Sequence, residues 1–162
     1  MTDVTGEHVK VLFPLDQDED GWPPVSTEGL WAVRLDGDAV RIDNTPWFVT
    51  NVACGDIVRV NEDVDGQLRA VEKVKWSGNC PIRVIPFRDG RFEGELSPVI
   101  ELFAPVGVTG EGLAQFGLVA LNVPGDVDLA TVQELLWRGS DEGWWDFDEG
   151  CVGDAWTALQ SR

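Results

Sequence analysis

The stretch "DLATVQELLWRG" at residues 128–139 carries the clearest helical pattern in the chain and decides its fold class. Asp128 is a preferred N-cap residue, and Gly139 is of the type that commonly ends a helix. Between them an apolar stripe runs along one helix face, formed by Leu129, Val132, Leu135 and Leu136. This helix follows a chain half rich in short strands, so the pattern favours an α+β fold.

Other elements are predicted on both sides of this helix. Ser97-Pro98 has the pattern of an N-cap followed by proline at the first helical position, and "VIELFA" continues this short helix as far as Pro105. Strands are predicted at residues 80–87, 114–123 and 143–150. With residues 80–87 as the first strand, the order is βαβαβ, which suggests a ferredoxin-like layer.

The N-terminal half reads as several short strands separated by turns. "HVKVLFPL" at 8–15 is a strand with partial alternation. Residues 29–42 read as two strands around Asp36-Gly37, and residues 55–76 as two strands around Asp65-Gly66. Residues 44–49 form a short extended piece between them. This spacing of strands and turns predicts a small β-barrel or sandwich.

The two patterns predict a β-rich half at residues 1–90 and an α+β half at residues 91–162. The strand at 80–87 fits either half, and the joint is expected near residues 88–95. A chain of 162 residues fits one domain or two small halves, so we expect both to pack as one compact unit.

The net charge of −17 is unevenly distributed along the sequence. Residues 1–30 carry a net −6, residues 31–91 a net 0, and residues 92–162 a net −11. Such a field repels nucleic acid and anionic membranes, and it accelerates association with basic partners. The alternative interpretation is that the acidity serves only solubility.

Several classes of site are disfavoured by composition. The three cysteines, Cys54, Cys80 and Cys151, form no CxxC pair, and His8 is the only histidine, so neither a zinc site nor a Ser-His or Cys-His pair is predicted. The glycine-rich "GVTGEG" at 107–112 lacks the pattern of a phosphate loop and is predicted to be a flexible surface loop. We therefore predict no metal and no cofactor.

The predicted location is the cytoplasm. The N-terminal "MTDVTGEHVKVLF" has no basic region and no long apolar stretch, unlike a signal peptide. No apolar run approaches the roughly 18 residues of a membrane span.

The acidic stretch "GSDEGWWDFDEGCVGDAW" at residues 139–156 is the first candidate site. On a strand, Asp146 and Asp148 share one face, and Trp145 and Phe147 share the other. An aromatic ring rimmed by carboxylates suits an Arg or Lys of a partner. Metal binding or acid/base catalysis by these carboxylates is the less favoured alternative. The predicted partner-binding residues are Asp141, Glu142, Trp144, Asp146, Asp148 and Glu149.

Six of the eight tryptophans divide into two groups by pattern. Trp31, Trp76 and Trp137 lie on predicted strands or a helix and are expected in the core. The second group consists of tryptophans that the sequence pattern does not place on a buried face: Trp22, Trp47 and Trp144. Each of these is a candidate anchor for a partner, or alternatively part of a packing cluster between the halves.

A cleft between the two halves is the second candidate site, as packed halves often form a cleft at their joint. Its residues come from "DNTPWF" at 43–48 and "WSGNC" at 76–80. The second segment also fits a simple hairpin turn, with Gly78 and Asn79 at positive φ. The predicted cleft residues are Asp43, Asn44, Trp47, Ser77, Asn79 and Cys80.

The chain resembles a family of uncharacterised bacterial proteins, domain of unknown function 4265, over most of residues 9–151. The "ALNVPGDVDLATVQELLWRGSDEGWWDFDEG" segment resembles the family's ending. The C-terminal half is also similar, more weakly, to the regulator-of-ribonuclease-E-inhibitor type of α+β domain. Neither resemblance implies a reaction. The other matching segments are Leu30-Trp31-Ala32, Asp43-Asn44-Thr45-Pro46-Trp47-Phe48, Gly55-Asp56-Ile57-Val58, Ser77-Gly78 and Ile82-Arg83-Val84.

These features predict a non-enzymatic acidic binding protein, such as an inhibitor or immunity-type regulator of a basic protein. A basic nuclease is one such partner, since an acidic surface can mimic a phosphate backbone. The alternative function is a small-molecule-binding protein or enzyme with its site in the cleft between the halves. A third hypothesis is an accessory domain whose acidity serves only solubility.

Overall fold

The computed structural model of the chain describes residues 6–160, and its contacts divide the chain into two compact units. The first unit ends at Ser77 and the second begins at Gly78. The sequence predicts this boundary near residue 90, after the strand at 80–87. The structure assigns that strand to the second unit, because it pairs with strands on both of its sides there.

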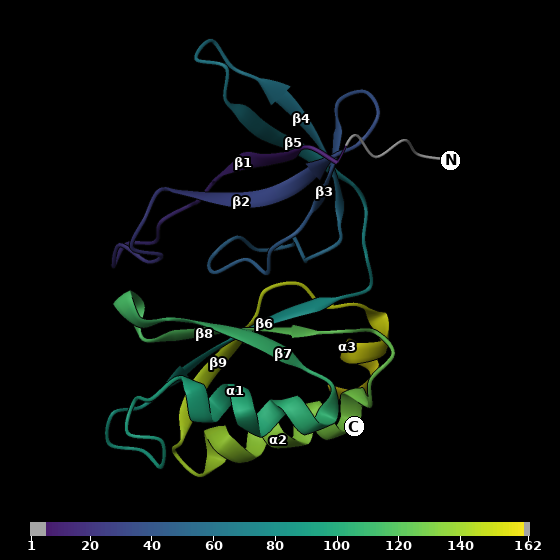
Figure 1. Cartoon of the computed structure of the whole chain (residues 1–162). Helices are drawn as coiled ribbons and strands as arrows, with labels where there is room; N and C mark the ends of the chain where they lie inside the picture. Colours follow the sequence, from purple (N-terminus) through teal and green to yellow (C-terminus); the bar gives the residue numbers. More distant parts are fainter. Residues whose placement is uncertain (1–5, 161–162) are drawn as a thin grey trace. The chain divides into compact units, whose positions relative to one another are not determined.

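The first unit is a closed barrel of five short strands. Consecutive strands pair antiparallel, and β1 closes the sheet by a short parallel pairing with β5 at Val11↔Leu68 and Leu12↔Arg69. Figure 1 shows these strands in purple to teal. The strands are β1 (His8–Pro14), β2 (Thr27–Arg34), β3 (Ala39–Ile42), β4 (Ile57–Glu62) and β5 (Leu68–Lys75).

Alternation along the strands fills the barrel with apolar side chains. Leu30 and Ala32 of β2 are buried while Trp31 between them faces outward, as the two-residue period of a strand requires. Gly37 and Gly66 adopt positive φ angles of 71° and 79° in the predicted turns, a conformation that glycine adopts at no steric cost. The interior contains Val11, Phe13, Leu30, Ala32, Val40, Ile42, Val58 and Val60.

The second unit is a four-stranded antiparallel sheet in the order β7-β8-β6-β9, with helices packed on it. Helix α1 contacts β7 and β8, and α2 contacts β9; both helices lie on the same face of the sheet (Figure 1). The elements are β6 (Cys80–Pro86), α1 (Ser97–Phe103), η1 (Ala104–Val106), β7 (Thr109–Leu113), η2 (Ala114–Phe116), β8 (Leu118–Val123), α2 (Leu129–Asp141), β9 (Trp145–Glu149) and α3 (Asp154–Gln160).

The mixed α and β composition is confirmed, but the predicted βαβαβ order is wrong by one strand. Residues 107–112, predicted to be a loop, enter the edge strand β7, which gives the order β-α-β-β-α-β before α3. A Cβ on Gly110 would meet Leu121 Cδ2 at 2.9 Å, and one on Gly112 would meet Leu96 Cδ1 at 3.0 Å. The glycines therefore allow close approach of neighbouring side chains rather than flexibility.

The helix ends also differ in part from the predicted ones. Asp128 does cap α2, accepting the Thr131 backbone N–H at 3.3 Å and its hydroxyl at 2.9 Å. The side-chain and backbone hydrogen bonds from Thr131 lower the pKa of Asp128. The predicted end at Gly139 is wrong, because the helix continues to Asp141 and uses Gly139 to pack against Trp145. In α1 the N-cap residue is Leu96, not Ser97.

The burial of the tryptophans agrees with the prediction for Trp22, which is 42% exposed, but differs from it for four others. Trp31, Trp76 and Trp137, expected in the core, are 47%, 37% and 51% exposed. Trp144, expected to be hard to bury, is 9% exposed, and Trp145 beside it is 0% exposed. The core of the second unit therefore lies between the sheet and the helices around Trp145, which contacts Phe103 of α1 at 5.7 Å between ring centroids.

Candidate functional site

The six predicted partner-binding residues lie at the end of α2, on β9 and in the turn between these elements of the second unit. Asp141 ends α2 and Glu142 caps it, and both are exposed. Asp146 and Asp148 are exposed on β9, while Trp145 is buried and Phe147 half-buried, so the predicted alternation of faces is confirmed. The acids of the helix end and those of the strand therefore come from different elements.

Trp144 is covered by cations of its own chain, and this changes its predicted role. The guanidinium carbon of Arg91 lies 4.7 Å from the Trp144 ring centroid, and that of Arg138 lies 5.4 Å from it. The edge-on ring of Phe92 adds a third neighbour at 5.8 Å. A buried indole that already has two cation–π contacts does not fit the predicted role of an accessible anchor.

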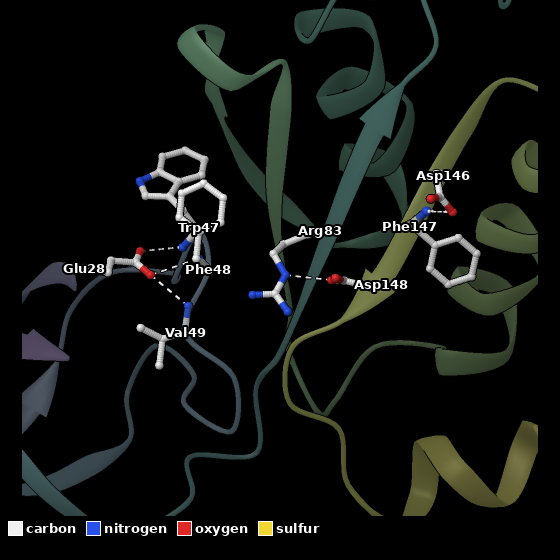
Figure 2. Close-up of polar contacts among 8 residues, drawn as sticks. All are labelled: Glu28, Trp47, Phe48, Val49, Arg83, Asp146, Phe147 and Asp148. Carbon is white, nitrogen blue, oxygen red and sulfur yellow. Dashed lines mark hydrogen bonds and ion pairs between the residues drawn. The ribbon is translucent and has the colours of Figure 1, made fainter. Parts of the chain in front are cut away.

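Asp148 and Glu149 are engaged within the unit. Arg83 of β6, which is 8% exposed, donates from Nε to Asp148 Oδ1 at 2.7 Å (Figure 2). Glu149 accepts hydrogen bonds from the Trp156 indole N–H and the Gln160 amide, both on α3. These two carboxylates hold β9 to its neighbouring elements.

Asp146 bonds to the outer edge of β9. The Phe87 N–H donates to the Trp144 carbonyl, and the Gly150 N–H donates to the Pro81 carbonyl. Along β9, the backbone N–H and C=O groups of even-numbered residues therefore point toward β6, and those of odd-numbered residues point away from it. The Phe147 N–H therefore points to the open edge, where it donates to Asp146 Oδ1 at 3.0 Å (Figure 2). Asp146 thus occupies an edge N–H, which is one way in which proteins protect an exposed strand edge.

Asp148→Asn and Asp146→Asn are expected to differ in their effect on stability. The Asp148 change removes the charge from a hydrogen bond with the buried Arg83 guanidinium, so we expect a loss of about 1 kcal/mol in the free energy of unfolding. In Asp146→Asn the amide oxygen still accepts the Phe147 N–H, so the expected change is below about 0.5 kcal/mol. Urea denaturation of both variants tests this, and equal effects would contradict it.

The contact between the exposed ring of Trp137 and the half-buried ring of Phe147 was not predicted from the sequence. Trp137 of α2 is 51% exposed, and its ring meets Phe147 of β9 edge-on at 5.1 Å between centroids. Glu134 and Asp141 precede and follow Trp137 by about one helical turn, and both are exposed. We call these four residues, Glu134, Trp137, Asp141 and Phe147, the Trp137 patch.

The candidate cleft residues of the first unit hold its loops. Asn44 Oδ1 accepts the Trp31 N–H at 2.7 Å, and Asp43 lies 3.6 Å from His8 Nε2. The Trp47 N–H donates to Glu28 Oε2 at 2.6 Å. Of these three residues only Asp43 is exposed.

Glu28 organises the loop around Trp47, although the sequence did not indicate it. This carboxylate is 6% exposed and accepts three consecutive backbone N–H groups, those of Trp47, Phe48 and Val49, at 2.6 to 2.9 Å (Figure 2). The three bonds tie residues 47–49 to β2. This arrangement is a structural clamp, and it explains why residues 44–49 form no strand.

The other predicted cleft residues are Ser77, the last residue of the first unit, and Asn79 and Cys80 near the start of the second. The Ser77 N–H donates to Asp56 Oδ1 at 2.8 Å, and its hydroxyl donates to the Cys54 carbonyl at 2.8 Å. Asn79 is half-buried. Cys80 is 2% exposed, and burial raises the pKa of its thiol, which makes it a weak nucleophile at neutral pH.

The charge asymmetry along the sequence does not coincide with the units. The first unit contains 15 acidic and 7 basic residues, a net −8, and the second contains 14 and 5, a net −9. The negative charge is thus shared almost equally. Any specific contact must come from the local arrangement of groups and not from a surplus in one unit.

Residues 6–160 contain neither a cluster of metal ligands nor a membrane-spanning helix. Among these residues, no three His, Cys, Asp or Glu side chains gather in a way that could hold a metal ion. No helix in the same range has the length and apolar character needed to cross a membrane.

Comparisons with known proteins identify a family and a fold. The family model described as "Domain of unknown function (DUF4265)" matches residues 28–147, most of the chain. A solved structure described as a hypothetical protein from Neisseria gonorrhoeae is similar with a TM-score of 0.72 and 18% identity, covering 93% of this chain and 98% of that one. No curated protein matches. These matches show the family and the fold, and they indicate no activity.

Proposed function

We propose a function for this chain, which belongs to the DUF4265 family, from its own residues: it is a non-enzymatic protein that binds a basic segment of a partner protein through the Trp137 patch. The observation that supports this most is the half-exposed indole of Trp137, held edge-on by Phe147. Large exposed aromatic side chains beside carboxylates are typical of contact surfaces for Arg and Lys.

The patch offers both parts of a cation-binding contact. The indole face attracts a guanidinium or ammonium through its ring quadrupole, and Trp is the best ring for this. Glu134 and Asp141 lie about one helical turn before and after Trp137 along α2, and each can accept hydrogen bonds from a cation of a basic segment. Because Phe147 fixes the ring, little side-chain entropy is lost on binding.

The net charge of −17 adds a long-range contribution. It accelerates encounter with a basic partner and makes the association rate fall as salt rises. Glu142, exposed at the C-cap of α2, extends the acidic edge of the patch. An inhibitor or immunity-type regulator of a basic protein is the class of function that this mechanism fits, and a cytoplasmic location is part of the proposal.

The binding test uses an arginine-rich peptide as the probe, with fluorescence anisotropy at low and high salt. Trp137→Ala is expected to weaken binding about 5- to 30-fold, because it removes a cation–π contact of about 1–2 kcal/mol. Trp31→Ala is the matched control, since Trp31 is a similarly exposed indole on the first unit, and we expect it to bind like the unaltered protein.

Two outcomes would contradict the proposal. Equal loss in Trp137→Ala and Trp31→Ala would mean that the peptide responds only to net charge. Unchanged affinity in Trp137→Ala would remove the indole from the contact. A weaker salt dependence in Glu134→Gln/Asp141→Asn would support the carboxylate part of the mechanism.

The alternative function is small-molecule binding. A hollow in the first unit is a better candidate site for it than the predicted cleft residues. A hollow of about 450 Å³ lies beside the short β1–β5 closure and is lined by charges of both signs, including Lys10, Arg34 and Glu62. Such a lining suits a small zwitterion. Saturable binding of amino acids that is lost in Lys10→Ala would favour this alternative.

We also infer that the second unit is a ferredoxin-like layer and that the closed first sheet is the small barrel that the sequence predicts. The β-α-β-β-α-β order and the β7-β8-β6-β9 sheet support the first inference.

A further inference from the structure

Two of the three cysteines lie in the second unit, one on β6 and one just after β9, the strand that pairs with it. Cys80 begins β6, and Cys151 follows β9 by two residues. The antiparallel register pairs Ile82 with Glu149, and the Gly150 N–H donates to the Pro81 carbonyl at 2.9 Å. Continuing this register by one residue places Cys151 opposite Cys80.

The hydrogen-bonding pattern makes this position suitable for a cross-strand bond. Pro81 and Gly150 form the hydrogen-bonded position, so the next pair, Cys80 and Cys151, is a non-hydrogen-bonded one. Opposing Cα atoms at such positions lie about 4.5 Å apart, within the range of about 4.4–6.8 Å that a disulfide spans.

The electrostatics of Cys80 agree with this proximity. Burial raises the pKa of its thiol, the Gly153 N–H lowers it, and the nearby Cys151 and Glu149 raise it further. Cys151 is thus close enough to act on the Cys80 charge. Both residues are thiols in the structure, with Cys80 2% and Cys151 8% exposed. The remaining cysteine, Cys54, belongs to the first unit.

We propose that Cys80 and Cys151 form a redox modification site that closes to an intramolecular disulfide in the presence of a low-molecular-weight disulfide such as oxidised glutathione. The Cys151 thiolate, as the more exposed of the two, attacks one sulfur of the oxidant and releases one glutathione thiolate. Cys80 is a weak nucleophile toward free reagents, but here its target is the neighbouring Cys151 Sγ, so the attack is intramolecular. The Cys80 thiol loses its proton to solvent, and the thiolate attacks Cys151 Sγ of the mixed disulfide and releases the second glutathione. In total the two protein thiols lose two protons and two electrons, and the oxidant becomes two thiols.

The bond would fasten the segment after β9 to the first residue of β6. Residues 151–153 lead directly into α3, whose Trp156 is 1% exposed in the core. A covalent link at Cys151 therefore restrains the start of α3, and we expect the melting temperature of the oxidised protein to be higher than that of the reduced protein.

The test uses the full chain carrying Cys54→Ser, so that only the facing pair can react. The protein is incubated with oxidised glutathione, quenched with acid, unfolded and labelled with N-ethylmaleimide before intact-mass analysis. The expected product is two hydrogens lighter than the reduced chain, takes up no label, contains no glutathione, and yields a linked Cys80–Cys151 peptide. Dithiothreitol should restore two labels per chain.

Two results would overturn the proposal. One is retention of two labels after oxidation, and the other is a persistent glutathione adduct with no linked peptide. Cys54→Ser/Cys151→Ser serves as the control and should give no loss of two hydrogens. Should that control fail to fold, the peptide map of the Cys54→Ser chain alone decides, because it identifies the bonded residues directly.

Discussion

Gly139→Ala is expected to destabilise the second unit by about 3 kcal/mol, although alanine is the better helix former. A Cβ at this position would lie 2.1 Å from Trp145 Cε2 and 2.6 Å from its Nε1. That indole is 0% exposed and donates to the Leu136 carbonyl at 3.0 Å, so it has no low-energy way to move aside. Helix propensity alone would raise the free energy of unfolding by about 1 kcal/mol. The sign of the measured change therefore shows whether helix propensity or the clash with Trp145 dominates.

Urea denaturation followed by circular dichroism measures this change. Ser140→Ala, the next residue of the same helix, is the matched control and should be neutral or slightly stabilising. A Gly139→Ala protein at least as stable as the unaltered chain would show that Trp145 is not packed against α2 as described.

Glu28→Ala is expected to destabilise the first unit by about 3 kcal/mol. The change removes the acceptor of three backbone N–H bonds from a site where the carboxylate is 6% exposed, and hydrogen bonds to charged groups contribute about 1.5–3 kcal/mol each. Glu28→Gln keeps one oxygen and should lose less. The amides of Trp47, Phe48 and Val49 should exchange with deuterium much faster in Glu28→Ala.

Glu62→Ala is the control for this prediction, because Glu62 is an exposed glutamate on β4 of the same barrel. Its expected effect is within about 0.5 kcal/mol. If Glu28→Ala left amide exchange at residues 47–49 unchanged, the carboxylate would not be what fixes this loop.

Local sequence signals predicted most of the elements. The Asp128 cap, the apolar stripe of α2 and the glycine turns at Gly37 and Gly66 each have a short-range physical cause, and the structure contains all of them. The mixed α and β composition follows from these signals. The edge strand β7 was not predicted because Gly110 and Gly112 are poor strand formers by propensity. The need for glycine at these two positions is explained only by the close approach of the Leu121 and Leu96 side chains.

The candidate site was less predictable, because exposure of an aromatic ring depends on tertiary packing. Trp137 and Trp144 are seven residues apart in the sequence, yet the first is open and the second lies beneath Arg91 and Arg138. Arg91 is distant in the sequence, so no local pattern indicates this cover. The Asp148–Arg83 pair likewise depends on the β6–β9 register, which the sequence does not specify.

The most direct measurement of the central claim is a nuclear magnetic resonance titration of the ¹⁵N-labelled full chain with an arginine-rich peptide. Each of the eight tryptophans contributes one indole N–H signal, so the contact can be assigned to a side chain. Binding at the Trp137 patch predicts saturable shifts of the Trp137 indole and of the Glu134 and Asp141 amides, with the exposed indoles of Trp22 and Trp31 unchanged. Shifts at Trp22 or Trp31 equal to those at Trp137, or no shift at Trp137, would contradict it.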